Sequence, residues 1–449
     1  MHSPGIYRWP AALLCWMLKA VDVHSHLQMG DPGKTSEKKH PLRVLVVSEL
    51  YYPEDAATAF FITKIAEGLA RQFQVHVYCA QPTYHQRHLR CAWKETRNGV
   101  QITRCFSTRF DRRRVSLRAI NIWSLCASVF VNLMRDTTDA DLLVVGTNPP
   151  VLPAVCWLVS LLKWARLILR IEDLYPQVLA AAGIVSSAST PYRLLEWLNA
   201  QVLARASTVV VLGRDMKARL LADYKAVFAD NHKIAVIPNW GEDELLDLPP
   251  GKQEALNGLN FSDHFVILFA GNLGRVQDLE TIVASAEMLK HDSAVRFLVV
   301  GSGFKRAWLE REVAARSLPN ITLLGQFPRT EQAKFLAVCD VGLVSLIPSM
   351  SGISVPSRSY NLLAAGKPVI ALVEADSEIG RLIAEHKVGW RVNPGSASEL
   401  SAIIATLSRQ PDLVAEYGRN ARRVVQTEYS FSKVLQMYTA LVDSYQQRA

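Results

Sequence analysis

The chain has 449 residues, of which 49% are hydrophobic, 20% charged and 8% aromatic. This length allows two or three domains with their own cores, and the composition is that of a folded protein rather than a disordered or fibrous one. Seven scattered cysteines without a C-x-x-C pair argue against a disulfide framework or a zinc site, and favour reduced thiols in the cytosol. The formal net charge is +9, and residues 87–118 carry ten basic residues against two acidic ones.

This basic segment has two interpretations, a solvated surface or a surface that attracts anions such as nucleic acid or lipid headgroups. Residues 119–134 (AINIWSLCASVFVNLM) follow it, and they are mostly apolar and too short to span a bilayer comfortably. A basic segment that leads into such a helix is typical of a helix lying on a membrane, and no nucleic-acid-binding motif is visible. We therefore expect no nucleic-acid partner and a membrane contact through Arg112, Arg113, Arg114 and Trp123.

Residues 1–40 stand apart from the rest of the chain. Arg8 is a poor basic flank for their short apolar run at 10–19, and no clear A-x-A cleavage site follows. We expect a disordered extension that contains a weak signal-like segment.

From residue 43 the sequence predicts strands that alternate with helices. In the first half we expect a helix at 55–71 and strands at 43–48, 75–79, 101–105, 142–145, 167–169, 208–212 and 234–237. Residues 151–171 resemble a transmembrane span in composition, but Lys163, Arg166 and Arg170 interrupt the stretch. A core helix followed by a core strand is the better interpretation.

A polar, proline-bearing stretch up to about residue 263 is interpreted as a linker, after which the alternation begins again. Strands are expected at 265–270, 297–300, 321–324, 341–346 and 369–372. Apolar strands separated by helices imply parallel sheets that are covered on both faces. The predicted fold class is α/β, with doubly wound domains at 41–245 and 246–425 and a C-terminal helix at 426–449 that packs back on the first domain. Ligands bind beyond the carboxyl ends of such strands, so the cleft between the domains is the expected site.

Residues 351–373 (SGISVPSRSYNLLAAGKPVIALV) are interpreted as a loop, a short helix and a buried strand. Pro356 suits the first helical position, and Gly366 suits the helix end. Ser357, Arg358 and Asn361 then lie near the positive end of the helix dipole, where an anion can bind.

Residues suited to a nucleotide diphosphate follow the other strands of the second half. The strand at 265–270 precedes GNLGRVQ, in which Arg275 can form a bidentate pair with phosphate. Gly301 begins a weak G-x-G, and Phe327 offers a ring that can flank a base. Turn glycines and a surface arginine are the plainer alternative.

The motifs AGNLGRVQDLETIVASAEML, VVGSGFKRAWLE, NITLLGQFP, CDVGLVSL and VPSRSYNLLAAGKPVIAL resemble the retaining glycosyltransferases of family 4. VSELYYPEDAATAFFITKIAEGLA, GTNPPVLPAV, IEDLYP and VIPNW agree with this in the first half. The resemblance covers about residues 41–431 and points to the bacterial O-antigen and exopolysaccharide branch of WbuB and WcaI type. It implies the GT-B fold, in which two Rossmann-like domains face a cleft, the first on the acceptor side and the second binding the nucleotide sugar.

The resemblance also implies transfer of a sugar from a nucleotide sugar without a metal or other cofactor. The string at 139–141 matches the D-x-D motif of metal-using transferases, but it precedes a strand, where a turn role is expected. Carried over by position, Arg275 holds the donor diphosphate and Asp173 faces the reacting sugar or the acceptor. The expected donor-binding residues are Gly271, Asn272, Gly274, Gln277, Gly301, Phe327, Ser354, Val355, Pro356, Ser357 and Asn361. The expected closing loop includes Tyr52, Glu54, Asp55 and Ala57.

Two positions depart from the family pattern. Gln277 stands where a lysine is common, and Ile353 and Asn361 stand where many members have two glutamates. We expect Arg358, one helical turn before Asn361, to supply the missing positive charge as a third catalytic residue. Preorganised positive groups stabilise a departing diphosphate, after which an acceptor hydroxyl attacks from the same face.

The sequence thus predicts a retaining, peripheral-membrane glycosyltransferase on the cytoplasmic face of the cell membrane. It would move a sugar, with UDP as the expected carrier, to a lipid-linked glycan acceptor in surface glycan synthesis. A catalytically inactive GT-B scaffold and a GT-B nucleotide-sugar epimerase are the alternatives.

Overall fold

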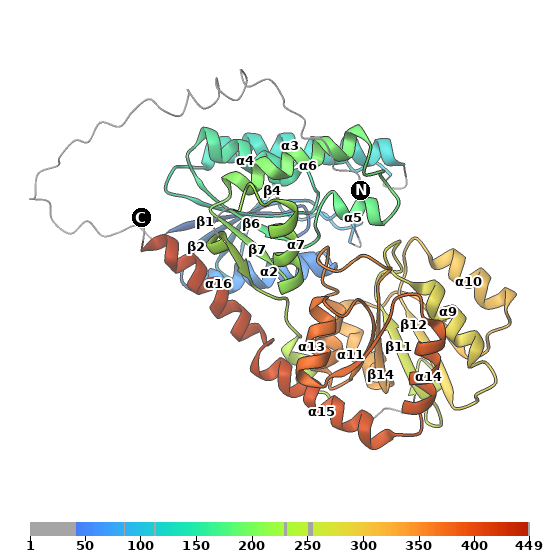
Figure 1. Ribbon diagram of the computed structural model, residues 1–449. Helices are drawn as coiled ribbons and strands as arrows, with labels where there is room; N and C mark the ends of the chain where they lie inside the picture. The colour runs from blue at the N-terminus through green and yellow to red at the C-terminus, as the bar shows by residue number, and fades with distance from the viewer. Residues whose placement is uncertain (1–41, 85, 112–113, 229–230, 250–254, 448–449) are drawn as a thin grey trace, which may run out of the picture. The chain divides into compact units, whose positions relative to one another are not determined.

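The computed structural model describes residues 42–447 apart from 85, 112–113, 229–230 and 250–254 (Figure 1). The expected N-terminal extension lies outside the described residues, as do Arg112 and Arg113. Two parallel α/β sheets follow each other along the chain, as the sequence predicts.

The first sheet has eight strands in the order β3-β4-β2-β1-β5-β6-β7-β8, and all are parallel except the antiparallel pair β3–β4. Its strands are β1 Arg43–Val47, β2 Gln74–Ala80, β3 Lys94–Arg97, β4 Val100–Cys105, β5 Leu142–Gly146, β6 Arg166–Ile171, β7 Thr208–Val211 and β8 Ile234–Val236. Its helices are α2 Ala57–Leu69, α3 Val115–Asp136, α4 Leu152–Leu162, α5 Gln177–Ala181, α6 Thr190–Arg205 and α7 Arg214–Asp223, with the short η1 Asn231–Lys233.

The second sheet has six parallel strands in the order β13-β12-β11-β14-β15-β16. Its strands are β11 Phe265–Ala270, β12 Val295–Val300, β13 Ile321–Leu324, β14 Val341–Ser345, β15 Val369–Leu372 and β16 Gly389–Val392. Its helices are α9 Leu279–Met288, α10 Arg306–Ala315, η2 Arg329–Glu331, α11 Gln332–Ala337, α12 Arg358–Ala364, α13 Glu378–His386, α14 Ala397–Leu407 and α15 Pro411–Thr427. The segment between the sheets holds α8 Asp243–Leu246 and a small hairpin of β9 Ala255–Leu256 and β10 Leu259–Asn260.

The chain crosses between the sheets at two adjacent points. The Gly241 N–H donates to the Tyr429 carbonyl at 3.1 Å, and Gly241 forms a parallel bridge with Ser430. After the second crossing, α16 Phe431–Gln446 packs against α2, and its Val434, Tyr438 and Tyr445 join the core of the first sheet. We call the first sheet with its helices and α16 the N-lobe, and the second sheet with its helices the C-lobe.

Every strand expected from the sequence is present, but short polar elements were missed. The edge strand β3 reads KETR, and β16 reads GWRV, so neither shows an apolar run. The predicted helix start at Pro356 is wrong by two residues, because Ser357 is the N-cap and α12 begins at Arg358. Gly366 follows that helix with φ +69°, a left-handed conformation that favours glycine.

Helix α3 corrects the expectation of an apolar segment too short to span a bilayer, because it has 22 residues. Among the described helices it alone is long and apolar enough, by length and composition, to cross a membrane. One side of α3 joins the core of the N-lobe through Leu125, Val129 and Leu133, whereas Trp123 is 65% exposed. Figure 1 shows α3, α4 and α6 along one face of the first sheet, where α4 packs against both other helices.

Candidate active site

A cavity of about 390 Å³ lies between the two lobes, a size suited to a small-molecule ligand. The C-lobe contributes the loops that follow β11, β12 and β13 and the start of α12, so the cavity lies at the carboxyl ends of parallel strands. The N-lobe contributes residues 55–57 at the start of α2, together with Phe61 and Tyr84. The residues expected from the sequence that line the cavity are Gly271, Asn272, Gly301, Phe327, Ser357, Arg358, Asn361, Asp55 and Ala57.

Glycines allow two C-lobe loops to meet at this cavity. Gly301 has φ +143°, and a Cβ there would lie 2.0 Å from the Gly271 carbonyl oxygen. Gly303 has φ +150°, and its Cβ would lie 2.5 Å from Asn272 Oδ1. The G-x-G after β12 is therefore required for close packing of the loops, whether or not it also approaches a ligand.

Arg358, the first residue of α12, lies in the cavity without pairing with any described carboxylate. Its Nη2 donates weakly to the Asn272 carbonyl at 3.4 Å, and its Cζ lies 4.5 Å from the centre of the Phe269 ring. Its buried Nη1 has no hydrogen-bond partner. Burial lowers the pKa of Arg358 to about 10, because the charged form has lost water without gaining an opposing charge. An anion in the cavity would satisfy this guanidinium.

Asn361 is fixed by a polar network that the sequence did not reveal. Its Nδ2 donates to Glu242 Oε1 at 2.7 Å and to Gln332 Oε1 at 2.8 Å, and its Oδ1 accepts from the Glu242 N–H at 3.2 Å. The same Glu242 oxygen also accepts from Gln332 Nε2 at 2.5 Å and pairs with Arg329 Nη2 at 2.7 Å. Both amide hydrogens of Asn361 are thus used, and one lone pair of Oδ1 remains for a ligand.

Arg329 links the two lobes beside this network. Its Cζ lies 3.8 Å from the centre of the Phe60 ring of α2, and its N–H donates to Asp55 Oδ2 at 3.3 Å. Burial lowers the pKa of Arg329, and the Glu242 carboxylate opposes this change. Sequence reasoning missed Arg329, although it follows Phe327 by only two positions.

Arg275 does not line the cavity in this structure. It is exposed, and its Cζ lies 3.4 Å from the centre of the exposed Phe304 ring. Gln277 is buried outside the cavity lining, and Lys305 Nζ donates to its backbone carbonyl at 2.7 Å. Gly274 also lies outside the lining, with its Cβ position 3.0 Å from Asn272 Nδ2.

Asp173 and residues 354–356 meet at the interface between the lobes rather than in the large cavity. Asp173 forms an antiparallel bridge with Ser354, and the Leu174 N–H donates to the Ile353 carbonyl at 2.8 Å. Asp173 lines a separate small cavity of about 20 Å³. Its burial, with a smaller contribution from the neighbouring Glu172 charge, raises the pKa of Asp173 to about 7.

Two residues of the expected closing loop, Tyr52 and Glu54, lie outside the lining of the large cavity. The buried Glu54 carboxylate accepts from the N–H groups of Thr83 and Tyr84, both at 2.5 Å, and so holds the loop after β2. Tyr52 lies on the surface, with Arg97 Cζ 3.8 Å from its ring centre.

The described residues contain no group of three or more His, Cys, Asp or Glu side chains placed to hold a metal ion. Asp141 of the D-x-D string is buried and accepts from Arg43 Nε at 2.7 Å and from the Thr138 N–H at 2.6 Å. It therefore stabilises the turn before β5.

Comparison with known protein families gives two matches. Residues 252–424 match the family described as "Glycosyl transferases group 1", and residues 58–240 match the "Glycosyl transferase 4-like domain". A glycosyltransferase of Pseudomonas aeruginosa named WbjE is 31% identical over 70% of this chain and 76% of its own length. The Escherichia coli protein WcaI, named as a colanic acid biosynthesis glycosyl transferase, is 26% identical over 88% of this chain and 98% of its own.

Solved structures show the same fold at low identity. Sucrose-phosphate synthase from Thermosynechococcus elongatus has a TM-score of 0.73 and 16% identity, over 91% of this chain and 100% of that one. Anabaena Alr3699/HepE, solved with UDP and glucose, has a TM-score of 0.69 and 16% identity, over 90% and 100%. These likenesses confirm the GT-B fold predicted from the sequence.

Proposed function

The chain belongs to the group 1 glycosyltransferases with a 4-like N-terminal domain, and on that premise we propose the reaction that it catalyses. It transfers a sugar from a nucleotide sugar, with UDP as the carrier, to a lipid-linked glycan acceptor. The anomeric configuration is retained and no bound metal takes part. The WcaI relative, whose name refers to colanic acid biosynthesis, supports a place in surface glycan synthesis.

The observation that carries this proposal is the unpaired Arg358 guanidinium in the cavity between the lobes. Its Nη1 is buried without a partner, and no described carboxylate neutralises it. A nucleotide diphosphate supplies the missing negative charge and acceptor oxygens. HepE, a neighbour in fold, was solved with UDP and with UDP-glucose, which supports the same ligand class here.

The reaction follows from the charge that develops on the donor. The bond between the sugar carbon and the diphosphate oxygen breaks, and Arg358 stabilises the negative charge left on the diphosphate. An acceptor hydroxyl bonds to the same sugar carbon from the face that the diphosphate leaves. Its proton passes to the departing phosphate oxygen. Because the acceptor hydroxyl attacks the sugar carbon directly, no covalent enzyme intermediate forms.

Other cavity residues orient the nucleotide. Phe327, whose ring packs edge-on against Phe335 with centroids 5.6 Å apart, offers a surface for the base. The remaining lone pair of Asn361 Oδ1 accepts a hydrogen bond from a ribose hydroxyl. The network around Glu242 holds the Asn361 amide in the orientation that this requires.

The exposed apolar side chains of α3, α4 and α6 support docking on the cytoplasmic membrane surface. Trp123 is 65% exposed, Trp164 just after α4 is 72% exposed and Trp197 is 53% exposed. Aromatic side chains of this kind insert at the interface between headgroups and acyl chains. The exposed large apolar residues of this face are Ile120, Trp123, Val131, Leu158, Leu161, Leu162, Trp164, Leu194 and Trp197.

Thermal unfolding with and without UDP tests the donor site. A bound ligand stabilises the folded state by about 2.7 kcal/mol at one hundred times its dissociation constant. We expect UDP to raise the Tm of the wild type and of an Arg419→Gln control, an exposed arginine on α15, but not of Arg358→Gln. If UDP and other nucleoside diphosphates leave the wild-type Tm unchanged, the proposal is wrong. Transfer of radiolabelled sugar to a lipid extract then separates a transferase from an inactive scaffold or an epimerase.

A further inference from the structure

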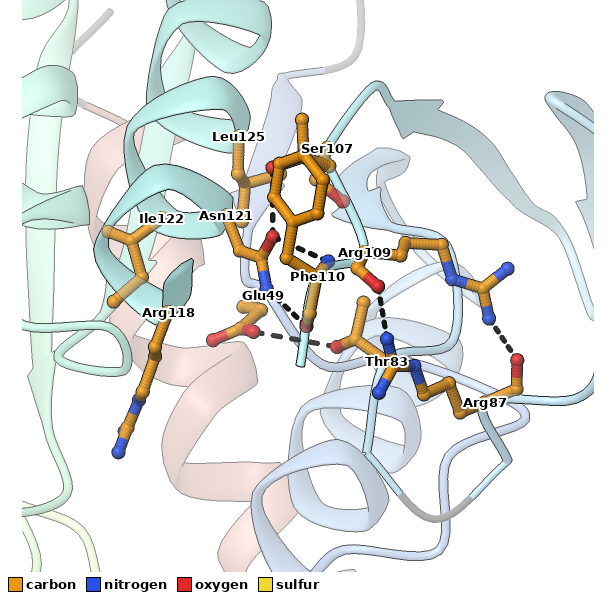
Figure 2. A pocket seen from close by; sticks show the side chains of 11 residues that line it. Glu49, Thr83, Arg87, Ser107, Arg109, Phe110, Arg118, Asn121, Ile122 and Leu125 are labelled. Atoms are coloured by element: carbon orange, nitrogen blue, oxygen red, sulfur yellow. Dashed lines mark hydrogen bonds between the residues drawn. The ribbon is translucent and has the colours of Figure 1, made fainter. Parts of the chain in front are cut away.

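A second pocket lies on the N-lobe, at the carboxyl ends of β1, β2 and β4 and beside the first turns of α3 (Figure 2). Its charged lining residues are Arg87, Arg109, Arg118 and Glu49, which gives a net charge of +2. The nucleotide cavity shares none of these residues, so the pocket has no role in the donor site described above.

Hydrogen bonds from α3 fix the wall of this pocket. Asn121 Oδ1 accepts from Thr108 Oγ1 at 2.8 Å and from the Phe110 N–H at 3.0 Å, while its Nδ2 donates to the Phe110 carbonyl at 3.0 Å. Ser124 Oγ accepts from the Thr108 N–H at 2.9 Å. Figure 2 shows Asn121 of the helix bonded to the segment after β4. The pocket is therefore preorganised by the fold.

The arginines on one side of the pocket bond to carbonyl groups. Arg109 Nη2 donates to the carbonyls of Pro82, at 2.8 Å, and of Arg87, while Arg87 Nη2 donates to the Arg109 carbonyl. Arg109 Nε is buried and has no hydrogen-bond partner. Burial, together with the positive charges of Arg90 and Arg87, lowers the pKa of Arg109, and the Glu54 charge opposes this. This concentration of positive charge is relieved when an anion binds.

Arg118 lies on the other side of Glu49 and points away from the pair formed by Arg87 and Arg109 (Figure 2). It is exposed, and its guanidinium makes no hydrogen bond or ion pair with any described residue. Burial and the negative charges of Asp173 and Glu172 raise the pKa of Tyr175, and the positive charge of Arg118 opposes this rise. Arg118 is therefore near the loop that meets the C-lobe at Ser354.

Part of the pocket border is apolar. Phe110, which lines the pocket, is 46% exposed, and Phe106 on the same segment is 58% exposed. On α3, Ile120 and Trp123 are exposed as well. A ligand at the pocket thus meets arginines on both sides of Glu49 and the apolar side chains of Phe110, Ile122 and Leu125. A phosphate group that carries a hydrocarbon chain has both of these properties.

We propose that this pocket binds the phosphate group of the lipid-linked acceptor. The inference rests on the proposed function and identifies where its acceptor is held. The enclosed volume of about 20 Å³ accommodates one phosphate oxygen next to Arg109. The rest of the phosphate lies at the mouth, beside the exposed guanidinium of Arg87, and the charge of Arg118 attracts it from across Glu49. The Glu49 carboxylate, 3.5 Å from Thr83 Oγ1, repels an anion on its own side and so limits where the phosphate can lie.

The test is calorimetric titration of geranyl diphosphate, a short soluble isoprenyl diphosphate, into protein saturated with UDP. Saturation blocks the donor cavity, so the heat reports the second site alone. We expect Arg109→Gln to raise the Kd about tenfold, which corresponds to the loss of one charged contact. Arg118→Gln should raise the Kd less, about threefold, because its charge acts from across Glu49. Arg135→Gln, an exposed arginine at the far end of α3, removes the same charge and should leave the Kd unchanged. Geraniol and inorganic pyrophosphate should each bind more weakly than geranyl diphosphate.

Equal Kd values for all variants would overturn the proposal. The proposal would also be wrong if the arginine variants bind geranyl diphosphate like the wild type but sediment less with phosphatidylglycerol vesicles. The pocket would then bind bilayer headgroups. Arg118→Gln should fold like the wild type, because the exposed Arg118 side chain makes no bond with a described residue. A change in its Kd therefore reports binding and not misfolding. A failed UDP thermal shift in the same samples would instead disprove the proposed donor site, so the two failures are distinguishable.

Discussion

The arginines of the cavity between the lobes and those of the N-lobe pocket differ in their exposure to solvent. In the cavity, Arg358 is partly buried with its Nη1 shielded from solvent, and the neighbouring Arg329 is neutralised by Glu242. In the N-lobe pocket, Arg87 and Arg118 are exposed beside an apolar surface. An enclosed charge is stronger because little solvent screens it, whereas an exposed one attracts ligands over a distance and weakens in salt. This difference fits the two proposed roles, chemistry in the first region and capture of the acceptor in the second.

The largest expected effect is on turnover by Arg358→Ala. Losing one preorganised positive donor raises the barrier by about 3 kcal/mol, roughly a hundredfold in kcat. Steady-state sugar transfer measures this, with Arg419→Ala as the control. A kcat within twofold of the wild type would show that the enclosed guanidinium does not stabilise the leaving group.

Arg275→Ala sharpens the same comparison inside the C-lobe. The family resemblance implies that Arg275 binds the donor diphosphate, so Arg275→Ala should raise the barrier to sugar transfer by about 3 kcal/mol. In the structure its guanidinium lies on the Phe304 ring outside the cavity lining, so this role requires the side chain to move when the donor binds. Unchanged turnover would remove Arg275 from the site and leave Arg358 as the proposed phosphate contact.

Glu242→Gln tests the network that holds the ribose side of the cavity. The substitution removes the negative charge that pairs with the buried Arg329 and weakens the bonds that converge on one oxygen. We expect the free energy of unfolding to fall by about 2 kcal/mol, measured by urea denaturation. The affinity for UDP should also fall, while the affinity for 2′-deoxy-UDP should change less. Equal losses for both nucleotides would argue against an oriented ribose contact.

Asp173 makes stability depend on pH. Its folded pKa of about 7 lies above the unfolded value of about 4, so between these pH values the folded state binds a proton that the unfolded state does not. The free energy of unfolding therefore falls as pH rises from 4 to 7, and then stays level. Because Asp173 is only half-buried, we expect about 1–2 kcal/mol. Asp173→Asn should remove this part of the pH dependence in urea denaturation, and an unchanged slope would contradict the raised pKa.

The smallest expected effect is on membrane docking by Trp123→Ala. Removing one exposed aromatic side chain from α3 should weaken sedimentation on anionic vesicles about fivefold, or about 1 kcal/mol. Met288→Ala on α9 of the C-lobe removes an apolar side chain of similar exposure, 58% against 65%, and serves as the control. Equal effects of the two substitutions would show that α3 has no special role.

The sequence alone predicted the two sheets, because buried parallel strands such as LLVVG and FVILFA are continuous apolar runs. It also located the cavity-lining loops after β11, β12 and β13, since ligand-binding residues follow parallel strands directly. Short polar strands such as β3 were missed because they show no apolar pattern.

Only the tertiary structure decided which side chains share the cavity. Glu242, Gln332 and Asn361 are far apart in the sequence, and the fold brings Glu242, which follows the crossing at Gly241, into contact with the other two. The same holds for Arg87 and Arg109, which the folding of the β2 and β4 loops brings into contact. Local pattern determines secondary structure because it depends on near neighbours, whereas a site depends on contacts that only the packed fold brings together.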